Sequence, residues 1–180
     1  FKVMYNGLPG DSTYYGGNGD GNITLNDESE WSGEMDDYWE DLSSNGLQSD
    51  GGAYTSTFSA ANFPHGGPNA PRAKIGEDAG IFAYADVGPL ALDLTTTENV
   101  YAISDCGDTG AFNSLNCDNA VYESEALAVD AKIDDGVGTT GNIVITNVTD
   151  ADEWWTMSDA TEVAYDLATD DLRTIIIKYG

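Results

Sequence analysis

Oxygen-bearing side chains alternate with glycine in the segment Asn18-Gly-Asp-Gly-Asn-Ile-Thr-Leu-Asn-Asp27. Alternation around a tight turn brings carboxylate and amide oxygens to one side of the chain, and calcium binds such oxygens. The segment matches an EF-hand loop only in part, because Gly16 stands at the first ligand position and an aspartate ends the loop. The alternative is an Asx- and Gly-rich turn whose polar groups are satisfied by its own backbone. The candidate calcium ligands are Asn18, Asp20, Asn22 and Asp27.

Two further acidic groups have the oxygen ligands that a hard cation needs. The second candidate site consists of the carboxylates beside a cysteine-containing stretch, Asp105, Asp108 and Asp118. The third group is Asp134-Asp135-Gly136. We interpret this last group as a helix end followed by a turn rather than as a metal site.

Cys106 and Cys117 are the two cysteines of the chain, and they lie in a stretch rich in glycine, asparagine and aspartate. We predict a disulfide between them, which would stabilise the fold by roughly 2–3 kcal/mol in the chain-entropy model. The alternative is two unpaired thiols in a reducing compartment. Their spacing fits no zinc pattern, because zinc would need further cysteine or histidine ligands.

Signals for catalysis are weak. The single histidine, His65, lies in a loop rich in proline and glycine, and any Ser–His–Asp or Cys–His site would have to use it. Paired carboxylates could hydrolyse glycosides, but with 32 acidic residues their abundance is no signal. We therefore predict that the protein is not an enzyme.

The charge balance is extreme, with 6 Lys and Arg against 32 Asp and Glu and a formal net charge of −26. Such a surface repels nucleic acid and anionic lipid, so we expect this domain to bind no nucleic acid directly. Self-repulsion would be offset by calcium or by high ionic strength, which favours an extracytoplasmic location. A length of 180 residues with 41% hydrophobic residues predicts one folded domain spanning residues 1–180.

Periodicity predicts the elements that would position these groups. Residues 1–5 resemble the last turn of a helix, and residues 12–29 a polar loop. Apolar side chains at helical spacing predict an amphipathic helix over 29–44, with the carboxylates of Glu34, Asp37, Glu40 and Asp41 largely on its other sides. The apolar stripe consists of Trp31, Met35, Tyr38, Trp39 and Leu42. Asn45-Gly46 predicts the end of this helix.

The second half of the chain alternates strand and helix signals. Strands are predicted over 80–87, 90–95, 99–103, 142–148 and 173–179. Helices are predicted over 119–133, capped by Asp118 or Asn119, and over 158–171. This order indicates an α+β fold with an antiparallel sheet.

Four segments resemble a known group of bacterial proteins, the type IV pilin-like proteins and type II secretion pseudopilins with a prepilin-type cleavage site. Tyr5-Asn-Gly-Leu-Pro-Gly-Asp11 resembles their Tyr-Asn-Ala-Leu-Pro-Gly-Asp segment, and Asn18-Gly-Asp-Gly-Asn-Ile23 resembles their next loop. Glu34, Trp39, Leu42 and Gly46-Leu47 match a pattern on the helix that follows. Ala131-Lys-Ile-Asp-Asp-Gly136 with Thr140-Gly-Asn-Ile143 resembles a late segment of the family.

The resemblance implies a pilin-like head, in which the end of an N-terminal helix packs on an antiparallel β-meander with additional short helices and long loops. It further implies a filament subunit of a pilus or a secretion pseudopilus, with copies of itself or other pilin-like subunits as partners. The apolar helix that anchors such proteins in the inner membrane is absent from this sequence, and we expect it to precede Phe1 in the natural protein. The implied location is bacterial and extracytoplasmic, at a periplasmic pseudopilus or a cell-surface pilus.

Two other functions remain open at this point. Trp154-Trp155 and Tyr14-Tyr15 stand in polar surroundings and could stack on sugars, which fits a secreted, calcium-stabilised carbohydrate-binding or adhesin module. A secreted hydrolase would require a cleft with a carboxylate pair, of which the sequence carries no specific sign.

Overall fold

The structure is a computed structural model, and it describes residues 1–27, 30–48, 52–56, 70–76, 79–85, 99–108, 115–118, 120–138, 140–146 and 172–179. These residues form an α+β fold in which every strand pairing is antiparallel. Within the described residues, no helix combines the length and the apolar character needed to cross a membrane.

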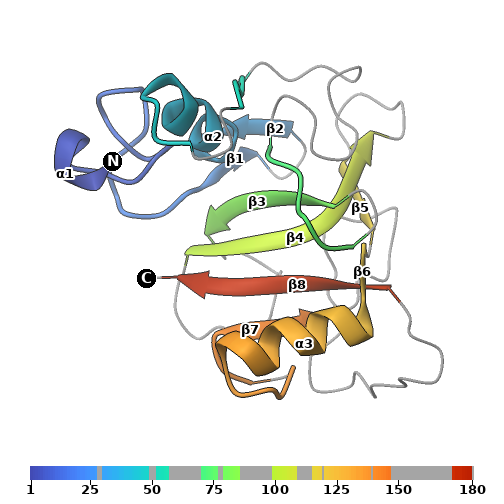
Figure 1. Cartoon of the computed structure of the whole chain (residues 1–180). Coiled ribbons are helices and arrows are strands. Elements are labelled where there is room, and N and C mark those ends of the chain that lie inside the picture. Colours follow the sequence, from blue (N-terminus) through green and yellow to red (C-terminus); the bar gives the residue numbers. More distant parts are fainter. Residues whose placement is uncertain are drawn as a thin grey trace.

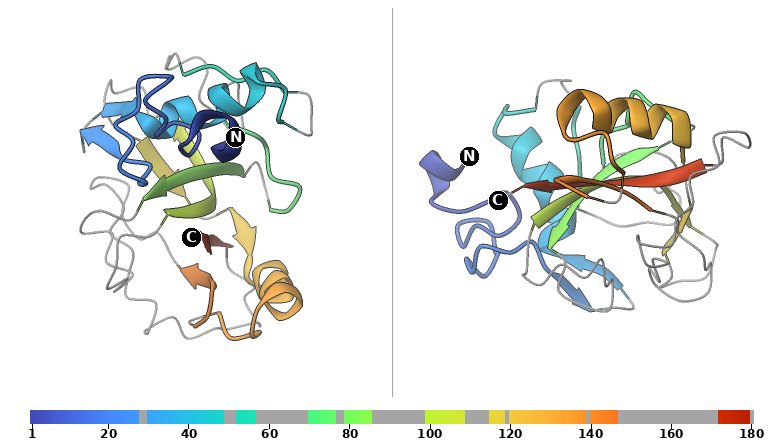
Figure 2. Two further views of the ribbon diagram at one scale, coloured as in Figure 1. Left: turned by 90° about the vertical axis from the view of Figure 1, so that its left-hand side faces the viewer. Right: turned by 90° about the horizontal axis from the view of Figure 1, so that it is seen from below.

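The first half of the fold consists of short elements around one longer helix. Helix α1 (Lys2–Tyr5) ends at Asn6, which has a left-handed backbone with φ of 53°. Strands β1 (Leu25–Asp27) and β2 (Glu30–Gly33) form a two-stranded ribbon, and helix α2 (Glu34–Ser44) follows directly. In Figures 1 and 2, α1 lies at the edge of the molecule, and a long loop returns the chain from it toward α2.

The main sheet is built around the last described strand. Strand β8 (Leu172–Tyr179) pairs with three other strands. These are β4 (Asn99–Asp108), β7 (Ile143–Thr146) and the short β6 (Val121–Tyr122). Strand β3 (Gly80–Ala85) pairs with β4, whose far end also pairs with β5 (Leu115–Asp118). Helix α3 (Glu123–Ile133) connects β6 to the loop before β7.

Both faces of the sheet are covered, each by one helix. Alternation along a strand sends successive side chains to opposite faces, and Ile175 and Ile176 of β8 accordingly belong to different clusters of buried residues. The cluster under α2 contains Met35, Tyr38, Trp39, Phe82, Val100, Ala102, Val144 and Ile176. The cluster under α3 contains Ile103, Val121, Ala126, Ile143, Ile145 and Ile175. Figure 2 shows α3 lying along one face of the sheet.

Within the described residues, the predicted helices and strands are confirmed in type, with three corrections. The predicted polar loop over 12–29 contains strand β1 at Leu25–Asp27, which pairs with β2. The helix predicted from residue 29 begins at Glu34, because residues 30–33 pair with β1 as strand β2. The helix predicted from residue 119 begins at Glu123 after Tyr122, because Val121 and Tyr122 pair with β8. The predicted strand over 90–95 and helix over 158–171 lie outside the described residues.

Candidate metal centre

The loop between α1 and β1 is pressed against the beginning of α2. Gly10 has φ of +78°, and a Cβ atom at this position would lie 2.0 Å from the carbonyl oxygen of Glu34. Any side chain there would therefore push the loop away from the helix. Glycine at position 10 brings the following residue, Asp11, beside the first residue of α2.

Glu34 holds both ends of the glycine-rich segment of that loop. Its side-chain Oε1 accepts a hydrogen bond from the backbone N–H of Asn18 at 2.8 Å. Its Oε2 accepts hydrogen bonds from the backbone N–H of Thr24 at 2.9 Å and from the Thr24 hydroxyl at 2.7 Å. Glu34 is 5% exposed, a burial that its predicted place outside the apolar stripe did not lead us to expect. The loop from Leu8 to Thr24, which covers it, is the reason.

Asp11 is the most deeply buried acid of this region, with 2% of its surface exposed. Its Oδ2 accepts a hydrogen bond from the backbone N–H of Gly21 at 3.1 Å, whereas its buried Oδ1 has no hydrogen-bond partner. Burial raises the pKa of Asp11, and the negative charges of Glu34 and Asp20 add to the rise. The Gly21 and Gly19 backbone N–H groups act against it and lower the pKa.

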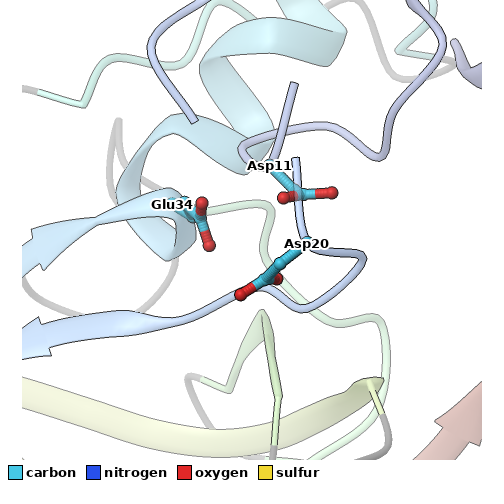
Figure 3. Close-up of side chains that lie close together, drawn as sticks. All are labelled: Asp11, Asp20 and Glu34. Carbon is cyan, nitrogen blue, oxygen red and sulfur yellow. The ribbon is translucent and has the colours of Figure 1, made fainter. Parts of the chain in front are cut away.

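Asp20 completes a group of three carboxylates. One oxygen each of Asp11, Asp20 and Glu34 lies within 4.8 Å of the others. Figure 3 shows the three side chains converging from three separate stretches of chain. Asp20 is exposed, and its Oδ1 accepts a hydrogen bond from the Asn22 backbone N–H at 2.8 Å. The cluster therefore has two buried acids and one that solvent reaches.

A pocket of about 360 Å³ adjoins this cluster. Its lining includes Asp11 and Asp20, the backbone of the glycine-rich loop, and one cationic side chain, Lys2. The remaining lining residues are Asn6, Gly7, Leu8, Gly19, Gly21 and Asn99. The pocket has room for several water molecules beside the carboxylates.

The residues of the predicted calcium loop have different roles in the structure. Asp20 is part of the cluster, but the Asn18 side chain accepts a hydrogen bond from the Asp20 backbone N–H at 2.7 Å and so closes an Asx turn. The backbone N–H of Asn22 donates a hydrogen bond to Oδ1 of Asp20 at 2.8 Å, and the Asp27 side chain lies outside the described residues. The two buried acids, Asp11 and Glu34, were missed because they are distant in sequence. Both stand in segments that carry the family resemblance, which was the available signal.

A second acidic cluster lies at the end of α3. Oxygens of Asp130, Asp134 and Asp135 lie within 4.8 Å of one another. Asp134 accepts a hydrogen bond from the Ile143 backbone N–H at 2.9 Å, and Asp135 accepts one from the Thr140 hydroxyl at 2.7 Å. Asp130 is fully buried, and burial raises its pKa. Helix α3 does end here, as the sequence predicts, and Gly136 with φ of +78° follows.

The predicted pair Cys106 and Cys117 is described by backbone alone. The two residues are direct partners in the antiparallel pairing of β4 and β5. Opposite residues in such a pairing have Cα atoms about 4.5–5.5 Å apart, which a disulfide can span. The backbone of Asp105 faces that of Asp118 one pair away, and Asp108 faces Leu115. The side chains of these three aspartates lie outside the described residues, as does His65.

The chemistry that the first cluster supports is the binding of a hard cation. All three side chains offer carboxylate oxygens, the ligands that calcium and magnesium prefer. Three carboxylates within 4.8 Å also repel one another in a partly buried setting, and a divalent cation would relieve that repulsion.

Comparisons with protein-family models, with curated proteins and with solved structures find no match for this chain.

Proposed function

We propose that this chain is the extracytoplasmic head of a type IV pilin-like filament subunit, in a pilus or in a type II secretion pseudopilus. The single observation that supports this most is the placement of α1. This helix lies at the edge of the body, and its side chains Val3 and Met4 are 99% and 64% exposed. Exposed apolar side chains on a peripheral helix are suited to contact with a neighbouring subunit.

Three of the four segments that resemble pilin-like proteins form one structural unit. The segments 5–11 and 18–23 and the start of α2 meet around Glu34 and Asp11. Tyr5 hydrogen-bonds through its hydroxyl to the Asn45 side chain at the far end of α2. The unit fastens α1 to the body, which a subunit that polymerises through an N-terminal helix would require.

The test is to shear surface filaments from the native host and to compare them with the envelope fraction by mass spectrometry. The proposal requires an apolar helix ahead of Phe1 in the natural protein, beginning with an N-methylated residue. Recovery from filaments with that modified end would identify a pilin, and recovery only in the envelope would identify a pseudopilin. Recovery as free protein in the medium without such an end would contradict the proposal.

One observation favours a second function, an adhesin or carbohydrate-binding module. Tyr14 and Tyr15 are 72% and 36% exposed, and they join Phe1 and Tyr5 in a cluster of rings with centroids 4.6–6.0 Å apart. Exposed aromatic rings can stack on sugars. Glycan-array binding that Tyr14→Ala abolishes would support this function, and an array without binding would remove it.

A further inference from the structure

We propose that Asp11, Asp20 and Glu34 form a calcium site that fastens the loop after α1 to the beginning of α2. The inference rests on these residues alone and does not depend on the filament proposal. It differs from the calcium loop expected from the sequence, because its two buried ligands come from outside residues 18–27.

The unpartnered oxygen of Asp11 is the observation that requires a ligand. A buried carboxylate oxygen without a hydrogen bond costs free energy, and such groups normally have a partner. The acidic groups next to Asp11 are Asp20 and Glu34, which as carboxylates can only accept. A group that satisfies Asp11 between them must therefore be a donor or a cation, and a divalent cation also relieves the repulsion among the three carboxylates that lie within 4.8 Å.

The hydrogen bonds already present leave lone pairs for a cation. Oδ1 of Asp11 is unused, and Oε1 of Glu34 keeps one acceptor site, since a carboxylate oxygen offers about two such sites and Oε2 already accepts two hydrogen bonds. Asp20 uses Oδ1 for the turn at Asn22, which leaves its other oxygen. The same hydrogen bonds hold Glu34 and Asp20 in place, so the three ligands are positioned before an ion arrives. Water from the adjoining pocket can complete the six to eight ligands that calcium takes.

The ligand set selects the kind of ion. It contains only carboxylates, without the nitrogen or sulfur ligands that zinc and copper prefer. The ligands come from two loop positions and one helix end, an irregular arrangement that suits calcium better than the strict octahedron of magnesium. Asp20 is exposed and the pocket is open beside it, so an ion has a path to the buried acids.

Calcium would add a link between segments that are already joined through Glu34 and, at Gly10, through Asp41. It would hold residues 11 and 20 against residue 34, and thereby restrain the chain that leads from α1 into the body. We therefore expect calcium to raise the melting temperature of the chain and to protect residues 6–24 from proteolysis.

The experiment is calorimetric titration of the EDTA-treated 180-residue chain with calcium chloride. A background of 150 mM NaCl with millimolar magnesium suppresses diffuse binding to the acidic surface. Asp11→Asn and Glu34→Gln keep the size of each side chain and remove one ligand charge. Asp41→Asn is the matched control, because Asp41 is a buried acid of α2 outside the cluster. Asp135→Asn reports on the second acidic cluster.

We expect the wild type to bind calcium at this site with micromolar affinity. Asp11→Asn and Glu34→Gln should each weaken it at least about tenfold, and Asp41→Asn and Asp135→Asn should leave it unchanged. Terbium luminescence, excited through the tyrosines of the chain and quenched by added calcium, gives a second readout on the wild type. Circular dichroism checks that each variant is folded.

Three results would overturn the proposal. The first is a wild type without saturable calcium binding by heat or by terbium displacement. The second is binding that Asp135→Asn abolishes and Asp11→Asn leaves intact, which would place the ion at the end of α3. The third is an Asp11→Asn variant that is more stable than a wild type indifferent to calcium, which would show that a proton satisfies Asp11.

Discussion

The carboxylate of Asp41 accepts a hydrogen bond from the backbone N–H of Gly10 at 2.8 Å, across 31 residues of sequence. Asp41 lies in α2 and is 4% exposed. Its burial raises its pKa to about 6, the charges of Asp37 and Glu40 add to the rise, and the Gly10 hydrogen bond opposes it. Asp41 thus anchors the loop after α1 to α2 together with Glu34, and its raised pKa makes the Gly10 contact sensitive to pH.

We expect Asp41→Asn to stabilise the protein above pH 6. Between its ordinary pKa of 3.8 and about 6, Asp41 is protonated in the folded chain and ionised in the unfolded chain, so its contribution to stability is lost as pH rises through 6. Asparagine keeps an acceptor for Gly10 and carries no charge. Urea unfolding should show the variant about 1 kcal/mol more stable at pH 8, about half of that at pH 5, and equal to the wild type only below the unfolded pKa of 3.8.

Asp41→Ala is the control, because it removes the acceptor together with the charge. It should be less stable than Asp41→Asn at every pH. Equal stability of the two variants would mean that the Gly10 hydrogen bond contributes nothing.

Gly10→Ala should be far more damaging than an alanine at another left-handed glycine. At Gly10 the new Cβ would lie 2.0 Å from the Glu34 carbonyl oxygen, whereas at Gly46, with φ of +65°, it would meet nothing within 4 Å. We expect a loss of about 3 kcal/mol or more for Gly10→Ala and about 1 kcal/mol for Gly46→Ala. Denaturant unfolding of both variants measures the difference. Similar losses would show that the loop can lift from α2 at little cost.

Trp39 fills the core between α2 and the sheet, and its contribution should come from packing rather than from its polar atom. Its ring stacks against Tyr101 at 6.2 Å and meets Tyr38 edge-on at 4.9 Å, while its buried Nε1 has no hydrogen-bond partner. Trp39→Ala should cost about 3–5 kcal/mol. Trp39→Phe should cost less than half of that, because no hydrogen bond is lost. A larger cost for phenylalanine would indicate a partner for Nε1.

The pairing of Cys106 with Cys117 across β4 and β5 leads us to expect a disulfide in the purified protein. Thiol titration under denaturing conditions should detect no free thiol before reduction and two after it. A Cys106→Ser, Cys117→Ser double variant should lose roughly 2–3 kcal/mol of stability. Two free thiols in protein kept from reductants would contradict the prediction.

The spacing of apolar residues within single segments predicted most of the described helices and strands. The stripe of α2 is buried at Met35, Tyr38 and Trp39, and the apolar strands β3, β4, β7 and β8 all occur where alternation and β-branched residues indicate them. Residues 30–33 were placed in a helix because their spacing continues the stripe. These residues instead form strand β2, which pairs with β1. The spacing of apolar residues along the chain does not reveal which two segments will pair.

The prediction of the acidic cluster from the sequence has the same limit as the prediction of strand pairing. Asp20 was found because it lies in a repeating loop, whereas Asp11 and Glu34 become ligands only when Gly10 lets the loop approach α2. Burial of Glu34 was also unforeseen, since an acid at the start of an amphipathic helix normally faces water. A site assembled from three segments requires knowledge of how the chain folds back on itself.

The position of β8 bears on when the protein can fold during synthesis. This strand contacts β4, β6 and β7, so residues 172–179 complete the pairing of strands that were made much earlier. A nascent chain that stops before Leu172 would expose the apolar edges of β4 and β7 with nothing to cover them. Contacts between distant residues form slowly. We expect the sheet to assemble only after residues 172–179 have left the ribosome, and until then chaperones would have to prevent aggregation of the earlier strands.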